Sequence, residues 1–149
     1  MLVLMCQAGG QRFAVDARAV AQVVPRVQLK AVAGAPEWLA GLCVCRGQVV
    51  PVVDLCRLIA DHPCPRRWSN RVLLLSVPLR QSSRLCGLLV ESATTAPLAA
   101  AGTDGDATRL SPWGQVLLDE QGVYQLLDLH ELFSRERQDR LFPVATEPA

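Results

Sequence analysis

The sequence predicts a mainly β fold with short helices, built from two similar halves. Short apolar segments alternate with turns rich in Gly, Pro and Asp along the 149-residue chain. The pattern PVVDLCRLI at 51–59 returns as QLLDLHELF at 125–133, an offset of 74 residues, and each copy follows a predicted hairpin. The strand pairs within 2–15 and 72–90 also correspond. Two halves of this size are expected to share a core, because neither is large enough to be stable alone.

The first elements are expected to be a hairpin and a helix. Strands are predicted at 2–6 and 12–15, and Gly9-Gly10 between them is a hairpin turn signal. The segment DARAVAQVV at 16–24 predicts a helix that Asp16 caps and whose apolar residues share one face. Pro25 ends this helix.

The middle of the first half predicts a strand, a turn and a second hairpin. RVQLKAV alternates apolar and polar residues, which indicates a half-buried strand at 27–32. GAPEWLAG at 34–41 predicts a turn with a short helical piece. Strands at 42–45 and 48–53 form the hairpin, with Arg46-Gly47 at its tip. Asp54 is expected to cap a short helix that follows.

A linker at 61–70 leads into the second half, because this segment contains two prolines and several charges. Strands are predicted at 71–77 and 85–92, and a long loop from 96 to 112. Another hairpin follows within 114–127, turning at 119–122. Asp128 and Glu131 then form a capping-box pattern at the start of the last helix. We therefore expect one subdomain at about 15–65, a second at about 1–14 and 66–142, and a frayed tail at 143–149.

Composition and charge exclude several classes of function. The formal net charge is +1, from 15 basic and 14 acidic residues, which gives no electrostatic case for binding nucleic acid or an anionic membrane. No apolar run reaches the roughly 18 residues that a membrane span needs, so no direct membrane insertion is expected. The N-terminal segment lacks a basic leader, which predicts a cytoplasmic protein whose six cysteines are reduced thiols.

The sequence offers no catalytic, metal or cofactor site. No CxxC pair occurs, and the only histidines are His62 and His130, so the cysteines are expected to pack as small hydrophobic residues. Neither a glycine-rich phosphate loop nor a GxSxG nucleophile elbow is present. These absences favour an interaction protein over an enzyme. Two alternatives stay open: a stand-alone regulatory domain that binds a small ligand, and a thiol enzyme that uses Cys86 or Cys43.

Several motifs together resemble the CheW family of chemotaxis coupling proteins. They are FAVDARAVAQVV at 13–24, GLCVCRGQVVPVVDL at 41–55, CGLLVE at 86–91 and LLDLHELF at 126–133, in the order that the family has them. The resemblance implies two intertwined five-stranded barrels of the Src-homology-three-like type. It also implies a non-catalytic adaptor that binds the cytoplasmic tip of chemoreceptors and the regulatory domain of the CheA histidine kinase. QLKAVAGAP and the LFP tail are similar to adaptors of Wsp-type surface-sensing pathways.

The resemblance also implies a set of partner-binding residues. For each apolar residue in this set, the alternative is simple packing in the core. Gly41, Arg46 and Gly47 match a glycine and an Arg-Gly turn that the family uses near its partner surfaces. Val20 matches an apolar receptor-contacting position on the predicted first helix. Val72 and Gly87 match positions that border a groove suited to a receptor's helical hairpin.

Two further positions in this set depart from the family pattern. Family members commonly carry Glu where this chain has Gln22, and a polar residue where it has Val44. Gln22 removes the acidic neighbour expected for Arg46. A third, milder departure is Glu91, where the family usually has Asp. Either a divergent set of partners or loosened selection fits these substitutions.

Overall fold

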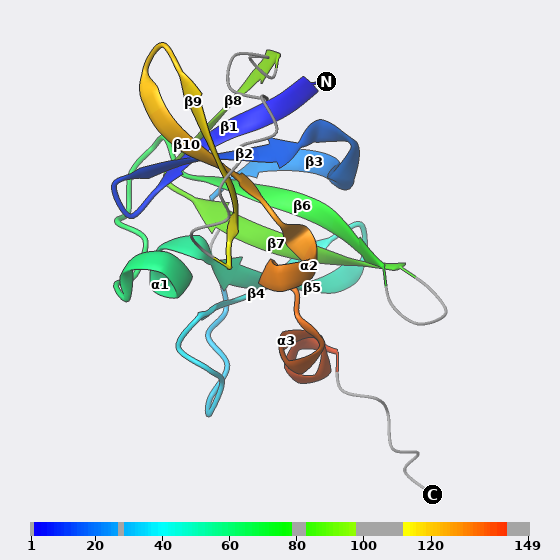
Figure 1. The fold of residues 1–149 in the computed structure, drawn as a ribbon. Coiled ribbons are helices and arrows are strands. Elements are labelled where there is room, and N and C mark those ends of the chain that lie inside the picture. Colours follow the sequence, from blue (N-terminus) through cyan, green and yellow to red (C-terminus); the bar gives the residue numbers. More distant parts are fainter. Residues whose placement is uncertain (1, 27–28, 79–82, 98–111, 143–149) are drawn as a thin grey trace, which may run out of the picture.

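The computed structural model describes residues 2–26, 29–78, 83–97 and 112–142, and these residues form two five-stranded sheets with a few short helices (Figure 1). The strands are β1 (Leu2–Ala8), β2 (Gln11–Asp16), β3 (Val20–Pro25), β4 (Leu39–Cys45), β5 (Gln48–Asp54), β6 (Arg71–Pro78), β7 (Ser83–Val90), β8 (Ser92–Pro97), β9 (Gly114–Asp119) and β10 (Gly122–Leu127). The helices are the short 3₁₀ helix η1 (Ala17–Ala19) and the α-helices α1 (Leu55–Ala60), α2 (Leu129–Leu132) and α3 (Arg135–Leu141).

The two sheets have the same internal plan. Sheet 1 has the strand order β8-β1-β2-β10-β9, and sheet 2 has the order β3-β6-β7-β5-β4. In each sheet two antiparallel hairpins meet through a parallel pair of strands, β2 with β10 in sheet 1 and β7 with β5 in sheet 2. The mainly β fold with two repeated five-stranded units is therefore confirmed.

Each half of the chain contributes strands to both sheets. Residues 66–142 therefore do not all lie in one sheet, as the predicted grouping had placed them. Strands β6 and β7 lie in sheet 2 beside β3 and β5, whereas β8, β9 and β10 join β1 and β2 in sheet 1. Apolar residues on both faces of the β6–β7 hairpin suit it to the interior of sheet 2. Gly87 permits this position, because a Cβ there would lie 2.8 Å from Val52 and 2.9 Å from Val72.

One hydrophobic core joins the two sheets. Phe13 and Val15 of sheet 1 pack in the same buried cluster as Val52 and Leu88 of sheet 2. Sheet 1 buries its other face as well, in a small cluster of Val3, Ala14, Leu117 and Tyr124. This double burial follows from the alternation of side chains along each strand, which sends neighbouring residues to opposite faces.

The helix predicted at 16–24 is wrong. Asp16 does act as a cap, since its Oδ1 accepts a hydrogen bond from the Arg18 amide at 2.9 Å, but only the three residues of η1 are helical. The chain then continues as β3, which pairs antiparallel with β6. The β-branched residues of VAQVV favour a strand, and pairing along β6 satisfies backbone groups that a helix would have left exposed at the edge of the sheet.

Three smaller expectations also need correction. Of the strand predicted at 27–32, residues 27–28 lie outside the described residues, and Lys30 forms only an isolated bridge with Leu42. The helical piece predicted at 34–41 is replaced by turns and the start of β4. Strand β8 was not predicted: its Thr-rich sequence pairs with β1 at the edge of sheet 1. The rest of the loop expected from 96 to 112 lies almost entirely outside the described residues.

The turns and caps that the sequence indicates are present. Gly9 and Gly10 both have positive φ in the β1–β2 turn, and the β4–β5 and β9–β10 hairpins form where they were predicted. Asp54 and Asp128 each accept hydrogen bonds from two amides of the helix that follows. At the end of the described chain, Phe142 packs against the core, and the tail at 143–149 lies outside the described residues.

Candidate partner-binding surface

The β4–β5 hairpin ends in a tight turn that projects an arginine. Arg46 and Gly47 have φ values of 52° and 75°, so both turn residues are left-handed. Two such residues match the twist of the flanking strands in a two-residue hairpin turn. Glycine adopts this conformation readily, whereas an arginine does so rarely. Both residues are exposed, and the turn therefore holds the Arg46 side chain at the surface beyond the ends of the strands.

An apolar pair lies directly behind this turn. Val44 of β4 and Val49 of β5 are opposite each other in the strand register, with 75% and 57% of their surface exposed. Two β-branched residues in this position stabilise the pairing of the hairpin, but their outer surfaces remain in water. Exposed apolar groups that are contiguous and bordered by polar residues are typical of protein interaction sites.

Arg46 contacts the opposite edge of the same sheet. Its Nη2 donates a hydrogen bond to Oε1 of Gln22 on β3 at 3.2 Å. Because β3 and β4 are the two edges of sheet 2, this contact requires the sheet to curl. The residue that replaces the expected glutamate thus still binds Arg46, through a neutral amide. Within the described part of the chain, Arg46 forms no ion pair, so its positive charge is not neutralised.

Val20 lies half-buried at the start of β3, next to a small apolar hollow. It pairs with Leu75 of β6, and Leu75 and the neighbouring Ala19 both line the hollow. The hollow has a volume of about 150 Å³ and lies between β6 and the helices α2 and α3. Its remaining lining residues are Ser76, Val77, Pro78, Leu129, His130, Phe133 and Gln138. Val20 is thus on a strand and not on the predicted helix, but it borders a groove.

Three of the predicted partner-binding residues are buried and have packing roles. Val72 is fully buried, and Gly87 makes room for it as described above. Gly41 has φ 148°, and a Cβ there would lie 2.7 Å from the carbonyl oxygen of Lys30. Its close approach permits the two backbone hydrogen bonds between Lys30 and Leu42, both 2.9 Å long. The exposed residues of the predicted set are therefore Gln22, Val44, Arg46 and Gly47. We call these four residues, together with Val49, the hairpin surface.

A second hairpin carries the same apolar pair, which the sequence reasoning missed. Leu118 and Val123 are opposite each other on β9 and β10, and 58% and 60% of their surface is exposed. They lie 74 residues after Val44 and Val49, the offset at which the nine-residue pattern repeats. Applying this offset to the whole hairpin would have found them. The turn between them carries Glu120 where the first hairpin has Arg46.

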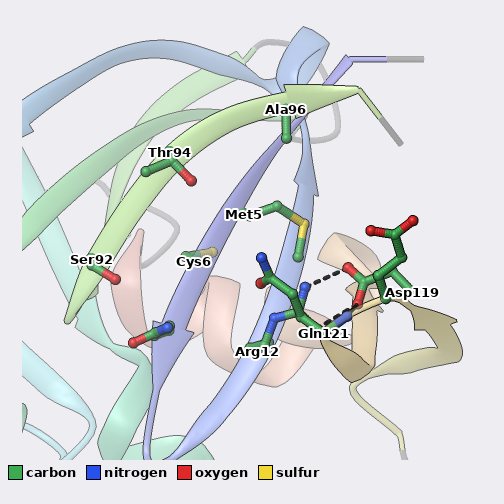
Figure 2. Close-up of a pocket in the computed structure, with 10 residues that line it drawn as sticks. Met5, Cys6, Arg12, Ser92, Thr94, Ala96, Asp119 and Gln121 are labelled. Atoms are coloured by element: carbon green, nitrogen blue, oxygen red, sulfur yellow. Dashed lines mark hydrogen bonds and ion pairs between the residues drawn. The ribbon is translucent and has the colours of Figure 1, made fainter. Parts of the chain in front are cut away.

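A polar hollow on sheet 1 bears on the alternative of a ligand-binding domain. It measures about 480 Å³ and lies beside β1, β2, β8 and the β9–β10 turn (Figure 2). Two of its charged lining residues, Arg12 and Asp119, are bound to each other, with Arg12 Nη1 2.9 Å from Asp119 Oδ1. This hydrogen bond is the main cause that lowers the pKa of Asp119. The Arg12–Asp119 pair is therefore already satisfied, and the other charged residue that lines the hollow is the exposed Glu120.

The thiols named as possible nucleophiles are held in unreactive surroundings. Burial raises the pKa of Cys86, whose Sγ donates to the carbonyl oxygen of Pro51 at 3.4 Å. Burial also raises the pKa of Cys43. A nucleophilic cysteine requires a lowered pKa, so neither residue fits a thiol enzyme. In the described ranges, no group of three or more His, Cys, Asp or Glu side chains is placed to hold a metal ion.

Comparisons with known proteins identify the family. A scan against protein families finds a CheW-like domain over residues 2–137. This chain belongs to the CheW-like family. Among solved structures, the scaffolding protein TtCheW from Thermoanaerobacter tengcongensis matches with a TM-score of 0.75 and 16% identity, over 91% of this chain and 89% of that chain. At this identity the likeness shows a shared fold. A search of the curated proteins finds no match.

Membership in the CheW-like family gives the general role. The family consists of non-catalytic scaffolds and adaptors that couple chemoreceptors to CheA, so this chain is an adaptor of chemotaxis signalling and not an enzyme. Its surfaces, and not a reactive group, must then carry its function. As for the membrane, the described residues contain no helix that is both long and apolar enough to cross one.

Proposed function

We propose that this CheW-like chain binds the regulatory domain of a CheA-like histidine kinase and the cytoplasmic tip of a chemoreceptor, and couples the state of the receptor to kinase autophosphorylation. The observation that supports the proposal is the hairpin surface, where Val44 and Val49 are exposed behind Arg46, which forms no ion pair with a carboxylate of the described residues. Folding leaves the apolar surface of this pair in water and gives Arg46 only a neutral hydrogen-bond partner, whereas an apolar and acidic partner would bury the pair and neutralise the charge.

The hairpin surface binds the kinase regulatory domain in this proposal. Burying Val44 and Val49 against an apolar patch gains roughly 25 cal/mol for each Å² removed from water. Arg46 selects the partner through a carboxylate, because its planar guanidinium binds carboxylates in a bidentate way. In the free adaptor, the amide of Gln22 orients the guanidinium at 3.2 Å without competing as a charge. A carboxylate partner can therefore displace this contact at low cost.

The receptor tip binds at the hollow beside Val20. The hollow has apolar walls from Leu75, Val77 and Phe133, and Ala19 at its border keeps it open. A receptor's helical hairpin presents ridges of apolar side chains, which fit grooves of this kind. The two sites lie at different places on the domain, since one is the tip of β4–β5 and the other lies between β6 and the C-terminal helices. One adaptor can thus hold both partners.

The mechanism is a shift between conformational states. The adaptor contributes no chemistry, so it can change kinase activity only by binding the active and inactive arrangements with different affinity. Placement in the cytoplasm at membrane receptor arrays follows from the two partners. The similarity of QLKAVAGAP and LFP to Wsp-type adaptors supports a surface-sensing output.

Reconstitution tests the proposal. The full chain is mixed with a CheA-like kinase and a receptor signalling fragment from the same genome, and co-sedimentation and autophosphorylation are measured. We expect the adaptor to enter the pellet with both partners and to change the rate of autophosphorylation. If neither quantity changes when the adaptor is added, the coupling function is contradicted.

A matched pair of variants separates the two sites. Filling the hollow with Ala19→Phe should weaken capture by the receptor fragment and leave binding to the kinase regulatory domain unchanged. Val44→Ser should have the opposite effect, because Val44 lies on the hairpin surface. Loss of both interactions in either variant would contradict the assignment of separate sites, provided that its circular dichroism matches wild type.

A further inference from the structure

Two of the six cysteines are held together by a single carboxylate. Oδ1 of Asp54 accepts the Cys56 amide at 3.0 Å, and Oδ2 accepts the Cys64 amide at 2.9 Å. The two residues therefore meet although eight positions separate them in the sequence. The side chains of Cys56 and Cys64 also interact with each other. The thiol of Cys64 also lies 3.8 Å from the carbonyl oxygen of Pro65, and Cys6 and Cys86 likewise direct their thiols at backbone carbonyl groups.

The surroundings make the two thiols unequal. The interaction with Cys64 is the main cause that lowers the pKa of Cys56; the amide of Gly9 acts in the same direction, while burial and the nearby carboxylates of Asp54 and Glu91 oppose it. The same pairing raises the pKa of Cys64, so Cys64 keeps its proton. Sγ of Cys56 also lies 3.9 Å from Oε2 of Glu91, to which the thiol donates a hydrogen bond. Cys56 is thus the nucleophile of the pair, and Cys64 is its protonated neighbour.

A small oxidant can reach this pair through the segment that carries Cys64. The segment at 61–69 is irregular, and its other residues are exposed or half-buried, whereas Cys64 is buried with 4% of its surface accessible. Two hydrogen bonds anchor the Cys64 backbone: its amide donates to Asp54, and its carbonyl oxygen accepts from Arg26 Nη1 at 3.2 Å. Cys56 itself is fully buried at the start of helix α1. Local opening of the segment at 61–69 is therefore the route to the pair, and it costs less than global unfolding.

We propose that Cys56 and Cys64 form a reversible intramolecular disulfide when the chain meets a peroxide, which makes this adaptor sensitive to oxidants. The Cys56 thiolate attacks one peroxide oxygen, the O–O bond breaks, and a sulfenic acid and one water result. The sulfur of Cys64 then attacks the Cys56 sulfur, gives up its proton, and releases the sulfenic oxygen as a second water. Two thiols are oxidised by two electrons, and one hydrogen peroxide is reduced to two waters.

The disulfide joins two elements that flank the second sheet. It links the first turn of α1, which directly follows β5, to the segment that leads into β6. Closing this loop removes conformational freedom from the unfolded chain, so the oxidised protein should melt at a higher temperature than the reduced one. Reduction by a thiol restores the original state.

Peptide mapping tests the proposal on the full chain. The folded protein is treated with hydrogen peroxide, free thiols are counted, and the remaining thiols are alkylated before digestion with trypsin. Trypsin separates the pair, since Cys56 falls in peptide 47–57 and Cys64 in peptide 58–66. We expect the thiol count to fall from six to four, these two peptides to appear as one linked species two hydrogens lighter, and dithiothreitol to restore six thiols.

Variants and a denatured control complete the test. Cys86→Ala should leave the linked species unchanged, whereas Cys64→Ala should abolish it and leave a Cys56 sulfenic acid that a cyclic diketone probe labels. In guanidinium the preference for this pair should disappear, because it depends on Asp54 and the fold. The proposal is overturned if six thiols persist under conditions that oxidise free glutathione, or if other pairs link as readily in the folded protein.

Discussion

The unit β4–β5–α1 and the unit β9–β10–α2 are built alike and differ at their tips. In both, the amide of the capping aspartate donates to the carbonyl of a tryptophan before the hairpin: Asp54 to Trp38 at 2.8 Å, and Asp128 to Trp113 at 2.9 Å. Both hairpins expose a cross-strand apolar pair. Their tips, however, carry opposite charges, from Arg46 in one and Glu120 in the other.

This difference indicates how one fold can offer two non-equivalent surfaces. The duplicated apolar pair supplies a similar hydrophobic contribution on either hairpin, so it cannot by itself distinguish partners. Charge can distinguish partners, because like charges placed together across an interface cost on the order of several kcal/mol, whereas opposite charges steer association. We infer that the tip charge, and not the apolar pair, decides which hairpin a given partner binds.

The two units also differ in how deeply they are anchored. Leu55 at the start of α1 is fully buried, whereas Leu129 at the equivalent position of α2 is half-buried. Replacing each by alanine is the strongest way to break the comparison. Leu55→Ala should lower the free energy of unfolding by about 2–5 kcal/mol, and Leu129→Ala by roughly half as much, since less apolar surface is removed. Urea unfolding measures both, and equal losses would show that the two units are anchored equally.

The capping aspartates give the next largest expected difference. Asp54 accepts amides of its own helix and also the amide of Cys64, and it is 4% exposed. Asp54→Ala should cost about 2–4 kcal/mol, because it removes a cap and leaves a buried amide without an acceptor. Asp128→Ala should cost about 0.5–2 kcal/mol, as for an ordinary cap. Thermal unfolding of both variants measures the loss of stability. A larger drop in melting temperature for Asp128→Ala than for Asp54→Ala would contradict the prediction.

Helix α3 connects the two units through one arginine. The Arg137 guanidinium lies 6.0 Å from the ring centre of Trp38 and 5.3 Å from that of Trp113, the equivalent residues of the two repeats. Its Nη1 also donates to the carbonyl of Glu131 at 3.2 Å. Arg137→Leu should therefore destabilise the fold by about 1–2 kcal/mol and shift tryptophan fluorescence. The neighbouring exposed Arg135→Leu is the control, and equal effects would mean that the tryptophan contacts contribute nothing.

The smallest expected effect is a pH dependence of stability that arises from Asp119 in the β9–β10 hairpin. The hydrogen bond from Arg12 lowers the pKa of Asp119 in the folded protein. Its stabilising contribution is therefore complete above the unfolded value of about 3.9, and it is lost as the pH falls through the lower folded value. The melting temperature of Asp119→Asn should lie below wild type at neutral pH and approach it in acid. A difference that is constant with pH would contradict this sign.

Local signals in the sequence predicted the hairpins and the caps, and tertiary contacts decided the rest. Gly9-Gly10, Arg46-Gly47 and the capping aspartates act through neighbouring residues, so their roles can be inferred from the sequence. The spacing of apolar residues in DARAVAQVV fits a helix, whereas the β-branched residues of VAQVV favour a strand, and pairing with the free edge of β6 decided between them. The exchange of hairpins between sheets likewise has no local signature.

The candidate surface was predicted in the same uneven way. Arg46 and Val44 lie at a turn, where exposure follows from the hairpin itself, and both are accessible. Gly41 and Gly87 were assigned to a partner because a glycine admits close approach. The close approach comes instead from the chain's own Lys30 and Val52. The sequence alone could not show which backbone or side chain would fill that space.

Exchanging the tip charges tests most directly whether the β4–β5 hairpin surface binds the kinase. Affinity for the isolated regulatory domain of a CheA-like kinase from the same genome is measured by calorimetry for wild type, Arg46→Glu and Glu120→Arg. We predict that Arg46→Glu weakens binding at least roughly tenfold, corresponding to about 1.4 kcal/mol, while Glu120→Arg binds as wild type does. Wild-type affinity in folded Arg46→Glu, or a loss confined to Glu120→Arg, would contradict it.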